Sequence, residues 1–312
     1  MPGFAKARRS TVVALSRRDM ATARESAEKF HIAHAFDSLD SLCACDQVDA
    51  VFVASPNSRH LPDVLTAVRY RKPVLCEKPM AMTASEARQM LDAANSAGVL
   101  LGIAHCFRFE DSVRRIRQRV QAGDIGRPVL ARAEFCYPGL GHPRAWLLDA
   151  EISGGGPIAD VGVHCIDALR FVLGDEVVRV AAVAQRDEHS GTVEASAVLS
   201  LEFARGTMGT VACSLRAPYR TPVEIVGTEG ILRADDGFNV ERPIRIELLR
   251  ESRVVDTEEV INDQTYARQV DAFAEAVETG RQFEVPGEDG WKNQLVLDAA
   301  YRSVKTGKFE SV

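Results

Sequence analysis

The first hundred residues alternate between short apolar runs and longer amphipathic segments, and this alternation limits the possible folds more than any other feature. Apolar, β-branched runs at 11–16, 50–55, 73–76 and 99–104 alternate with helical patterns at 21–30, 58–70 and 83–97. Strands and helices that alternate at these lengths form a parallel, doubly wound sheet. Ligands of such sheets bind at the carboxyl ends of the strands.

A dinucleotide is the usual ligand of this architecture, yet the glycine-rich loop that binds its pyrophosphate is missing. Gly3 is the only glycine before Gly98, so this half contains no G-x-G-x-x-G motif. A first strand, turn and helix need about 25 to 30 residues, and only ten precede the first apolar run. We therefore expect the chain to begin inside the first helix, with 11–16 as the second strand and the central strand missing.

The residues at the ends of the predicted strands are candidates for cofactor binding. Ser16, Arg17 and Arg18 end the first apolar run. A hydroxyl followed by two guanidinium groups suits a 2′-phosphate, which favours NADP over NAD. Two solvated arginines in a loop are the alternative. The candidates after the later strands are Ser55, Pro56, Asn57, Glu77, Lys78, Pro79 and His105.

The second half has a strand-like pattern. Residues 192–203 alternate strictly. Every second residue from Val193 to Phe203 lies on an apolar face, and the residues between them, with Thr192 and Glu194 at the start, lie on the other face. This pattern predicts a strand with one buried side. Further strands are expected at 129–137, 177–185, 207–215, 223–227, 231–234, 244–250 and 254–261, and helices at 111–121, 263–278 and 290–304. We therefore predict an N-terminally truncated α/β domain over 1–121, and an α+β domain with a large, mainly antiparallel open sheet over 122–312.

One predicted helix of the second domain carries a possible acid/base pair. Glycines at 154–156 indicate close approach of the backbone to another group, Pro157 suits the first turn, and Gly174 supplies the end. One face is apolar, comprising Ile158, Val161, Cys165, Leu169 and Val172, and the other is polar, comprising Asp160, His164 and Asp167. Asp160 and His164 are one turn apart, so the carboxylate can orient the imidazole. A pair on a solvated surface is the alternative.

Composition excludes several classes of function. The net charge is −6 without a long basic run, which argues against nucleic acid as a partner, and no apolar stretch approaches the roughly 20 residues that span a membrane. The seven cysteines are odd in number and scattered, which favours a reducing, cytoplasmic location. A metal-dependent hydrolase with Asp160 and His164 as ligands ranks far behind, because no H-x-H or H-E-x-x-H motif supports it.

Taken in order, the motifs resemble those of the glucose-fructose oxidoreductase, inositol dehydrogenase and rhizopine catabolism (Gfo/Idh/MocA) oxidoreductases. The resemblance rests on TVVALSRRD, DAVFVASPNSRH, VLCEKPMAMT, GGGPIADVGVH, VGTEGIL and PGEDG, in this order and spacing. It implies a Rossmann domain followed by a domain whose open sheet mediates homodimers or homotetramers. It also implies hydride transfer between NADP or NAD and an alcohol or carbonyl of a sugar, sugar derivative or cyclitol. The missing glycine loop is the departure from the family.

The resemblance assigns roles to individual residues. Lys78, Asp160 and His164 match the catalytic lysine, aspartate and histidine: His164 would act as base, Lys78 would stabilise the alkoxide and Asp160 would orient either of them. Ser55, Pro56, Asn57, His60 and Glu77 match cofactor contacts, and the Lys78–Pro79 bond matches a cis peptide. His105 and Arg108 match a segment near the nicotinamide and the substrate. Substrate contacts are also expected from the loop with His142, Arg144 and Trp146, from 215–220 and from Tyr266, with structural roles as the alternative.

A second class of function stays open beside the enzyme. Loss of a central parallel strand exposes apolar surface and unpaired backbone. A truncated, non-catalytic homologue that binds a sugar or a partner without redox turnover is therefore the alternative hypothesis.

Overall fold

The computed structural model describes residues 2–140, 144–240 and 242–312. Its contacts divide the chain into two compact units, one made of 1–104 with 266–291 and the other of 105–265 with 292–312. Helix α6 (Asp111–Gln121), which the sequence pattern assigns to the first domain, lies in the second unit. Helix α9 (Thr265–Thr279) and the start of α10 (Gly287–Thr306) lie in the first.

The parallel strands of the first unit fall into two separate sheets. Strands β1 (Ala14–Ser16) and β2 (His34–Phe36) form one, and β3 (Val51–Val53), β4 (Val74–Cys76) and β5 (Leu101–Ile103) form the other. Among the described residues no strand joins β1 to β3, as expected from the missing glycine loop. Every residue of β4 and β5 is buried, whereas every residue of β1 and β2 is half-exposed. The β1–β2 pair is therefore only partly covered, whereas a parallel sheet is normally buried on both faces.

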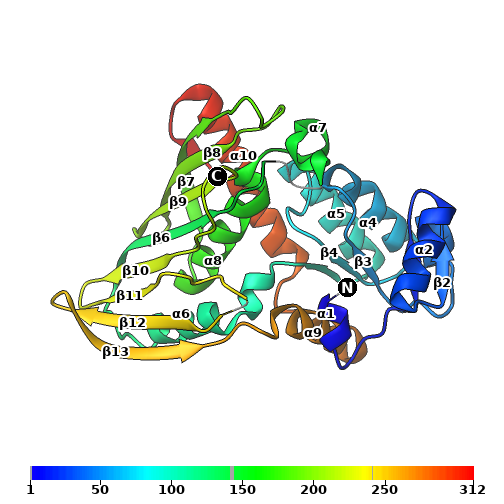
Figure 1. Ribbon diagram of the computed structural model, residues 1–312, viewed down its shortest axis with the longest axis horizontal. Coiled ribbons are helices and arrows are strands. Elements are labelled where there is room, and N and C mark those ends of the chain that lie inside the picture. Colours follow the sequence, from blue (N-terminus) through cyan, green and yellow to red (C-terminus); the bar gives the residue numbers. More distant parts are fainter. Residues whose placement is uncertain (1, 141–143, 241) are drawn as a thin grey trace. The chain divides into compact units, whose positions relative to one another are not determined.

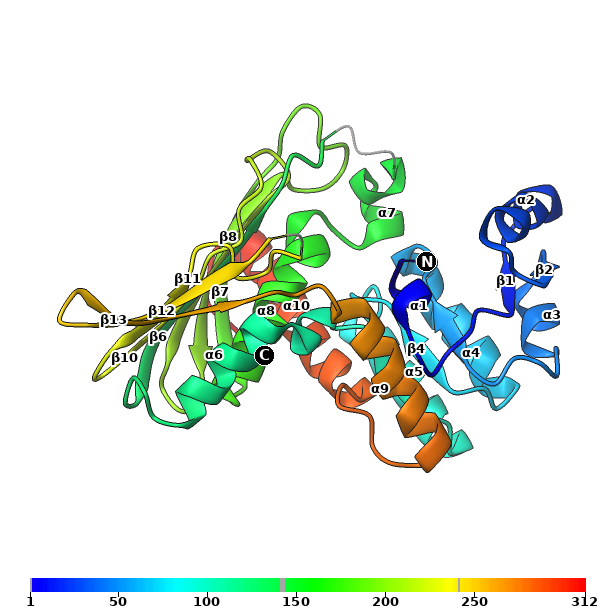
Figure 2. The same ribbon diagram turned by 60° about the horizontal axis from the view of Figure 1, so that its bottom comes forward.

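Helices flank these strands. They are α1 (Pro2–Lys6), α2 (Met20–Phe30), α3 (Leu39–Cys43), α4 (His60–Arg69, after a 3₁₀ turn at Asn57–Arg59) and α5 (Ala84–Ala97). The predicted α5 is confirmed: the Thr83 side chain accepts from the Glu86 amide at its start, and Gly98 ends it in a left-handed conformation. Figure 2 shows α2 and α3 beside β1 and β2. Strand β2 and helix α3 were not expected from the sequence.

The second unit is built on a sheet of nine strands in the order β13-β12-β11-β10-β6-β9-β8-β7-β14. Its strands are β6 (Pro128–Cys136), β7 (Val177–Gln185), β8 (Ser196–Phe203), β9 (Met208–Ser214), β10 (Val223–Gly227), β11 (Ile231–Ala234), β12 (Ile244–Arg250), β13 (Arg253–Val260) and β14 (Glu310–Ser311). All neighbours are antiparallel except β6 and β9. The expected large, mainly antiparallel sheet is confirmed (Figure 1).

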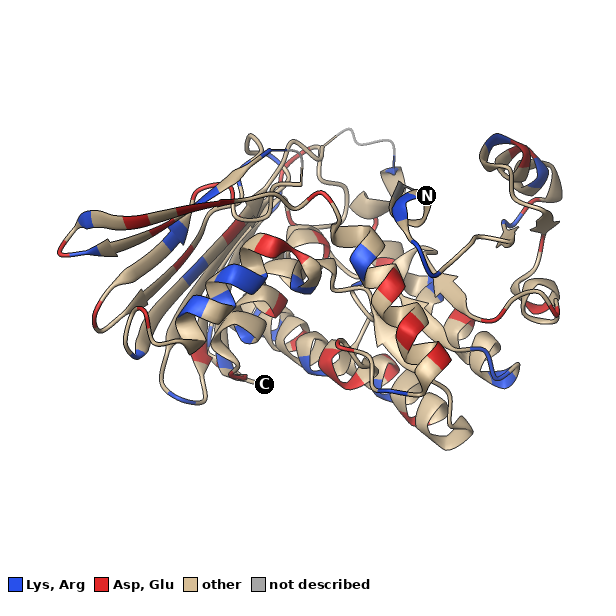
Figure 3. Cartoon of the chain, turned by 90° about the horizontal axis from the view of Figure 1, so that it is seen from below, with Lys and Arg blue, Asp and Glu red and all other residues tan. Residues whose placement is uncertain are grey.

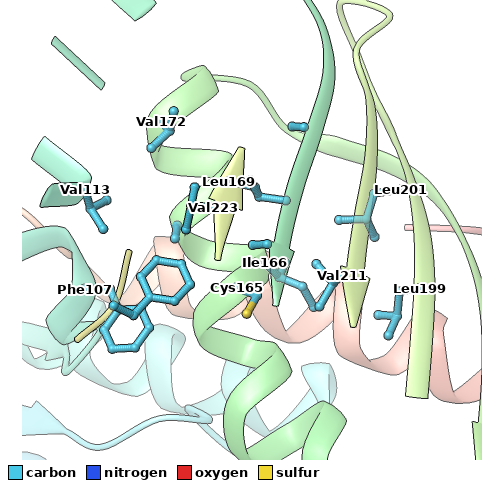
Figure 4. Packing of buried hydrophobic residues seen from close by; sticks show 14 of the residues in the cluster. Phe107, Val113, Cys165, Ile166, Leu169, Val172, Leu199, Leu201, Val211 and Val223 are labelled. Carbon is cyan, nitrogen blue, oxygen red and sulfur yellow. The ribbon is translucent and has the colours of Figure 1, made fainter. Parts of the chain in front are cut away.

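Helix α8 (Val163–Leu173) covers one face of this sheet, with α6 packed beside it. Its apolar side meets the strands, as Leu169, Cys165 and Ile166 near Val211 illustrate (Figure 4). All five residues that the helical spacing assigns to the apolar face are buried, at 5% exposure or less. The opposite face of the sheet carries exposed apolar side chains, including Val183, Val198 and Leu130.

Charged residues of both signs are interspersed along the helices and strands (Figure 3). All seven cysteines are free thiols. Within the described ranges, no helix is long and apolar enough to cross a membrane. In the same part of the chain, no group of three or more histidine, cysteine or carboxylate side chains is arranged to hold a metal ion.

Candidate active site

The helix that carries Asp160 and His164 begins with a π-helical turn. A short helix α7 (Ala150–Ser153) ends at Gly154 in a left-handed conformation, and the π turn Ile158–Gly162 runs directly into α8. Gly174 ends α8, also left-handed, so the predicted helix is confirmed at both ends. Single π turns inside helices occur often at functional sites because they displace the side chains of one turn. Asp160 lies in this turn, and His164 follows it.

Asp160 is half-buried and has a tyrosine as its partner. The Tyr137 hydroxyl, at the end of β6, donates to Asp160 Oδ2 over 2.5 Å. Burial and the Asp160 charge raise the pKa of Tyr137 far above its ordinary value, so the phenol stays protonated and keeps donating. One carboxylate oxygen is thereby held in place. The sequence placed Tyr137 only at the end of a strand expected at 129–137, because an isolated tyrosine in a sequence gives no sign of such a contact.

His164 packs beside two aromatic rings. Its imidazole stacks on Phe107, with 4.3 Å between ring centroids and 19° between planes, and lies 6.3 Å from the ring of Phe135. The residue is only 8% exposed. The alternative of a solvated surface pair is therefore wrong for His164. Stacking on Phe107 restricts rotation of the imidazole, which suits a group that must transfer a proton to or from one position.

Asp167, the third polar residue of this helix, lies in a buried charge cluster. Arg108 donates to both of its carboxylate oxygens, at 2.9 Å from Nε and 2.7 Å from Nη2. Arg170 lies 3.6 Å and His105 3.9 Å from the same carboxylate. Burial by itself raises the pKa of Asp167, but the charges of Arg108, His105 and Arg170 hold that pKa at about 2. Asp167 therefore stays ionised inside the protein.

This cluster bears on two residues that the sequence associates with ligands. Arg108 is 6% exposed and His105 is 1% exposed. The guanidinium of Arg108 already has a carboxylate partner within the protein. These contacts favour structural roles for both residues, and their roles toward nicotinamide and substrate stay predictions.

In the first unit, the turn after β4 carries Glu77 and Lys78. The Lys78–Pro79 peptide bond is cis, as the resemblance implies, and the Lys78 amide donates to Glu77 Oε2 over 3.2 Å. His60 contacts this turn and the turn after β3: its Nδ1 lies 2.9 Å from the Pro79 carbonyl oxygen, and its Nε2 lies 3.0 Å from the Ser55 carbonyl oxygen. The His60 ring thus connects the turns after β3 and β4.

His60 is fully buried, and burial lowers its pKa. A neutral imidazole has a single N–H and donates to one of the two carbonyls at a time. The contacts of His60 therefore suit a residue that holds the strand-end turns together. Ser55 donates from its hydroxyl to Asp63 over 2.7 Å, and Asn57 is buried at the start of the 3₁₀ turn. Contact of these residues with a cofactor stays a prediction.

The end of β1 leaves two cationic side chains exposed. Ser16 is the last residue of the strand and Arg17 and Arg18 follow it in solvent. The nearest following carboxylate, Asp19, accepts from the amide and the hydroxyl of Thr22 and so caps α2. These hydrogen bonds lower the pKa of Asp19. The Asp19 cap is a feature that sequence reasoning missed, although an aspartate three residues before Thr22 is a typical capping signal.

The remaining predicted substrate residues belong to both units. Trp146 lies half-buried in a 3₁₀ turn (Ala145–Leu148), and Arg144 before it is exposed. Tyr266, in the first unit, is 49% exposed. His142 lies outside the described residues.

The strand ends fit parts of a nicotinamide dinucleotide. Two exposed guanidinium groups after β1 suit a phosphate, and the turns after β3 and β4 supply polar side chains. Among the described residues no glycine-rich loop follows a parallel strand, so they supply no such cradle for the pyrophosphate. The described residues thus offer exposed cationic and polar groups at three strand ends, but no glycine-rich loop for the pyrophosphate.

Both halves of the chain match family models. Residues 1–105 match an oxidoreductase family with an NAD-binding Rossmann fold, and residues 113–233 match the GFO/IDH/MocA C-terminal domain. A 1,5-anhydro-D-fructose reductase from Ensifer adhaerens is 33% identical over 279 residues, which cover 87% of this chain and 82% of the relative. A D-xylose 1-dehydrogenase (NADP(+)) from Haloferax volcanii is 32% identical over 296 residues, covering 94% and 90%.

The fold is also found among solved structures. An aldose-aldose oxidoreductase from Caulobacter crescentus, complexed with glycerol, superposes with a TM-score of 0.91. It is 26% identical, and the match covers 100% of this chain and 95% of that one. The ordered motifs, the two-part fold and these matches agree: the chain belongs to the Gfo/Idh/MocA family of oxidoreductases.

Proposed function

We propose that this chain is a cytoplasmic, NADP-dependent oxidoreductase that transfers hydride between the cofactor and a CH–OH group, or the corresponding carbonyl, of a sugar, sugar derivative or cyclitol. The observation that carries the proposal is the π turn with Asp160, followed by a buried His164 stacked on Phe107, in a chain of an oxidoreductase family. A nicotinamide, when bound, supplies or accepts the hydride. The chain must then move the hydroxyl proton and stabilise charge on the oxygen.

We propose that His164 accepts the proton of the substrate hydroxyl. Its Nδ1 is buried, so Nε2 is the ring nitrogen that takes the proton from the substrate hydroxyl. Lys78 stabilises the negative charge that develops on that oxygen. Asp160, held by Tyr137, orients His164 or Lys78. Substrate specificity then comes from the loops that include Trp146.

The preference for NADP rests on the end of β1. Arg17 and Arg18 are exposed there, and a guanidinium binds a 2′-phosphate with charge-assisted hydrogen bonds. Asp19, the acidic side chain that could instead bind a ribose 2′-hydroxyl, is already engaged as the cap of α2. The Haloferax relative is named for NADP(+), which agrees with this preference. NAD is the alternative cofactor.

Sugars are the favoured substrates because the relatives are named for them. Their printed names refer to 1,5-anhydro-D-fructose, D-xylose and aldoses. The test is absorbance at 340 nm with NADP⁺ or NAD⁺ and a panel of aldoses, ketoses and inositols, and with the reduced cofactors in the opposite direction. We expect turnover with at least one sugar and a higher kcat/KM with the NADP pair. Sugar binding without turnover in either direction would instead support the non-catalytic homologue.

We also propose that a second copy of the chain covers the open face of the large sheet. Val183 and Val198 are paired across β7 and β8, and they are 76% and 56% exposed. On the same sheet, a shallow depression of about 220 Å³ is lined by Leu130, Met208 and their neighbours. Contiguous exposed apolar side chains of this kind mark association surfaces. Light scattering is expected to give a dimer or tetramer.

Substitutions on the sheet test this assembly. Val183→Lys combined with Val198→Lys is expected to give a monomer, because it places two charges in the apolar surface. Leu65→Lys on α4 replaces an apolar residue of the first unit that is 36% exposed, and it is the control. A monomeric wild type, or a double variant that assembles like wild type, would contradict the proposed interface.

A further inference from the structure

A buried carboxylate outside the predicted site binds the backbone at the start of the helix that carries Asp160 and His164. Glu194 precedes β8 and is 9% exposed. Its Oε2 accepts from the Gly156 amide at 3.0 Å, and its Oε1 accepts from the Ile158 amide at 3.1 Å. The Tyr301 hydroxyl, on α10, also donates to Oε1, at 3.0 Å. The strict alternation of residues 192–203 predicted a solvent-facing Glu194, and that prediction was wrong because the strand begins only at Ser196.

The glycine run leaves room for the Tyr301 side chain and for the backbone of Glu194. A Cβ on Gly155, which has φ +151°, would lie 1.7 Å from the Tyr301 hydroxyl oxygen. A Cβ on Gly156 would lie 2.1 Å from the Glu194 carbonyl oxygen. Gly154 has a separate task as the left-handed end of α7. The close approach expected from the sequence is confirmed, and the groups that approach are Glu194 and Tyr301.

The Glu194 carboxylate provides hydrogen-bond acceptors for amides that have no partner within the helix. The first N–H groups of a helix have no partner inside it, and Pro157 has none to offer. A carboxylate that accepts from the Gly156 and Ile158 amides fills this need and places negative charge at the positive end of the helix. The Gly156 carbonyl in turn accepts from the Asp160 amide at 2.9 Å. The peptide groups that precede Asp160 are therefore held on both sides.

Glu194 is itself fixed to the sheet. The neighbouring Ala195 amide donates to the Gln185 carbonyl at 2.7 Å, and the Ala195 carbonyl accepts from Leu215 at 2.9 Å. These bonds attach the segment to the ends of β7 and β9. A rigid support of this kind is what holds reacting groups to within fractions of an ångström.

We propose that Glu194, with Tyr301 as its hydrogen-bond donor, is a positioning residue for the reaction: it sets the place of the π turn and thereby of Asp160 and His164. This inference rests on the proposed function. Glu194 acts through the backbone of the turn. Its loss should lower kcat far more than it alters KM.

The test variant is Glu194→Gln. Glutamine keeps the volume but replaces one carboxylate oxygen by an NH₂ donor, which then faces a backbone donor. The matched control is Glu176→Gln, because Glu176 binds Arg170 at the other end of the same helix, at 2.7 Å. Tyr301→Phe removes one hydroxyl only and serves if Glu194→Gln does not fold. Steady-state kinetics and amide hydrogen exchange at residues 155–160 are measured on all of them.

We expect kcat of Glu194→Gln to fall about 30-fold, since small displacements of reacting groups cost up to about 10²-fold, with KM within about 3-fold of wild type. Exchange at Gly156 and Ile158 should accelerate in Glu194→Gln and, less, in Tyr301→Phe, and stay at the wild-type rate in Glu176→Gln. A wild-type kcat in Glu194→Gln, or an equal loss in Glu176→Gln, would overturn the proposal. If wild type itself has no turnover the proposed function fails, while the exchange data still report on the contacts of Glu194.

Discussion

The two units place their candidate residues on supports of very different kinds. In the first unit these residues follow strands of three residues each, and the strands form two separate parallel sheets. In the second they lie on a π turn and a helix packed against a sheet of nine strands. The second support is further fixed by buried polar contacts around Asp160, Asp167 and Glu194. The difference suggests that groups transferring protons need the stiffer support, whereas groups that bind a flexible dinucleotide need accessible strand ends.

The largest expected effect is on the chemistry of the second unit. His164→Gln keeps most of the side-chain volume beside Phe107 but removes the imidazole. We expect kcat to fall about 10²- to 10⁴-fold, the usual range for loss of a general base, with a melting temperature close to that of wild type. Steady-state rates at 340 nm and thermal unfolding measure both quantities. A variant that keeps more than about a tenth of wild-type kcat would remove His164 from the proposed role.

The same helix offers a contrasting position. Asp167→Asn removes the charge of the carboxylate that Arg108 binds inside the protein and that Arg170 approaches, and loss of one partner from a buried ion pair costs about 3–5 kcal/mol of unfolding free energy. Activity per folded molecule should change little. Urea unfolding and kinetics test this, with Asp256→Asn as the control, because that variant removes the charge of an exposed carboxylate paired with Arg119. Equal stability losses in the two variants would contradict the structural role of the cluster.

Acid should weaken this cluster in a defined interval. The folded pKa of Asp167, about 2, lies below its ordinary value of 3.8. The stability from this difference is therefore complete above about pH 4 and is lost as the pH falls toward 2; its size is on the order of 2 kcal/mol. Urea unfolding between pH 6 and pH 3 should show the advantage of wild type over Asp167→Asn shrinking below about pH 4. An advantage that stays constant over that range would count against the assignment.

The smallest expected effect belongs to the first unit. Replacing Arg17 and Arg18 by Ala should raise KM for NADP about 10- to 100-fold, the range for hydrogen bonds to a charged group, and should leave KM for NAD and the melting temperature nearly unchanged. Arg24→Ala, an exposed arginine on α2, is the control. Equal losses with both cofactors would mean that these arginines do not recognise a 2′-phosphate.

Much of the fold could be predicted from periodicity. Helix α6 and strands β7, β10, β11 and β12 have the expected bounds, because each carries a clear apolar pattern over its whole length. Strand β2 was missed because three residues, His34–Phe36, are too few to show a period. The separation of β1 from β3 was anticipated from the absent glycine loop. The composition of the two compact units could not be predicted, since each unit joins segments that are far apart in the chain.

The candidate site could be predicted only in part. The ordered motifs pointed to Lys78, Asp160 and His164, and the glycine run correctly indicated a close backbone approach. What approaches the glycines could not be read from the sequence, because Glu194 and Tyr301 come from other segments. Alternation even placed Glu194 on the wrong face. The π turn was missed as well, since it keeps the apolar spacing of an ordinary helix.

In the proposed reaction, His164, which follows the π turn of the second unit, takes the proton from the substrate hydroxyl. The most direct measurement is the pH dependence of kcat/KM for alcohol oxidation, in wild type and in His164→Gln. In wild type the rate should rise with pH as the imidazole loses its proton and becomes a base, and the variant should lack this rise. A rise of the same size and midpoint in His164→Gln would contradict the account.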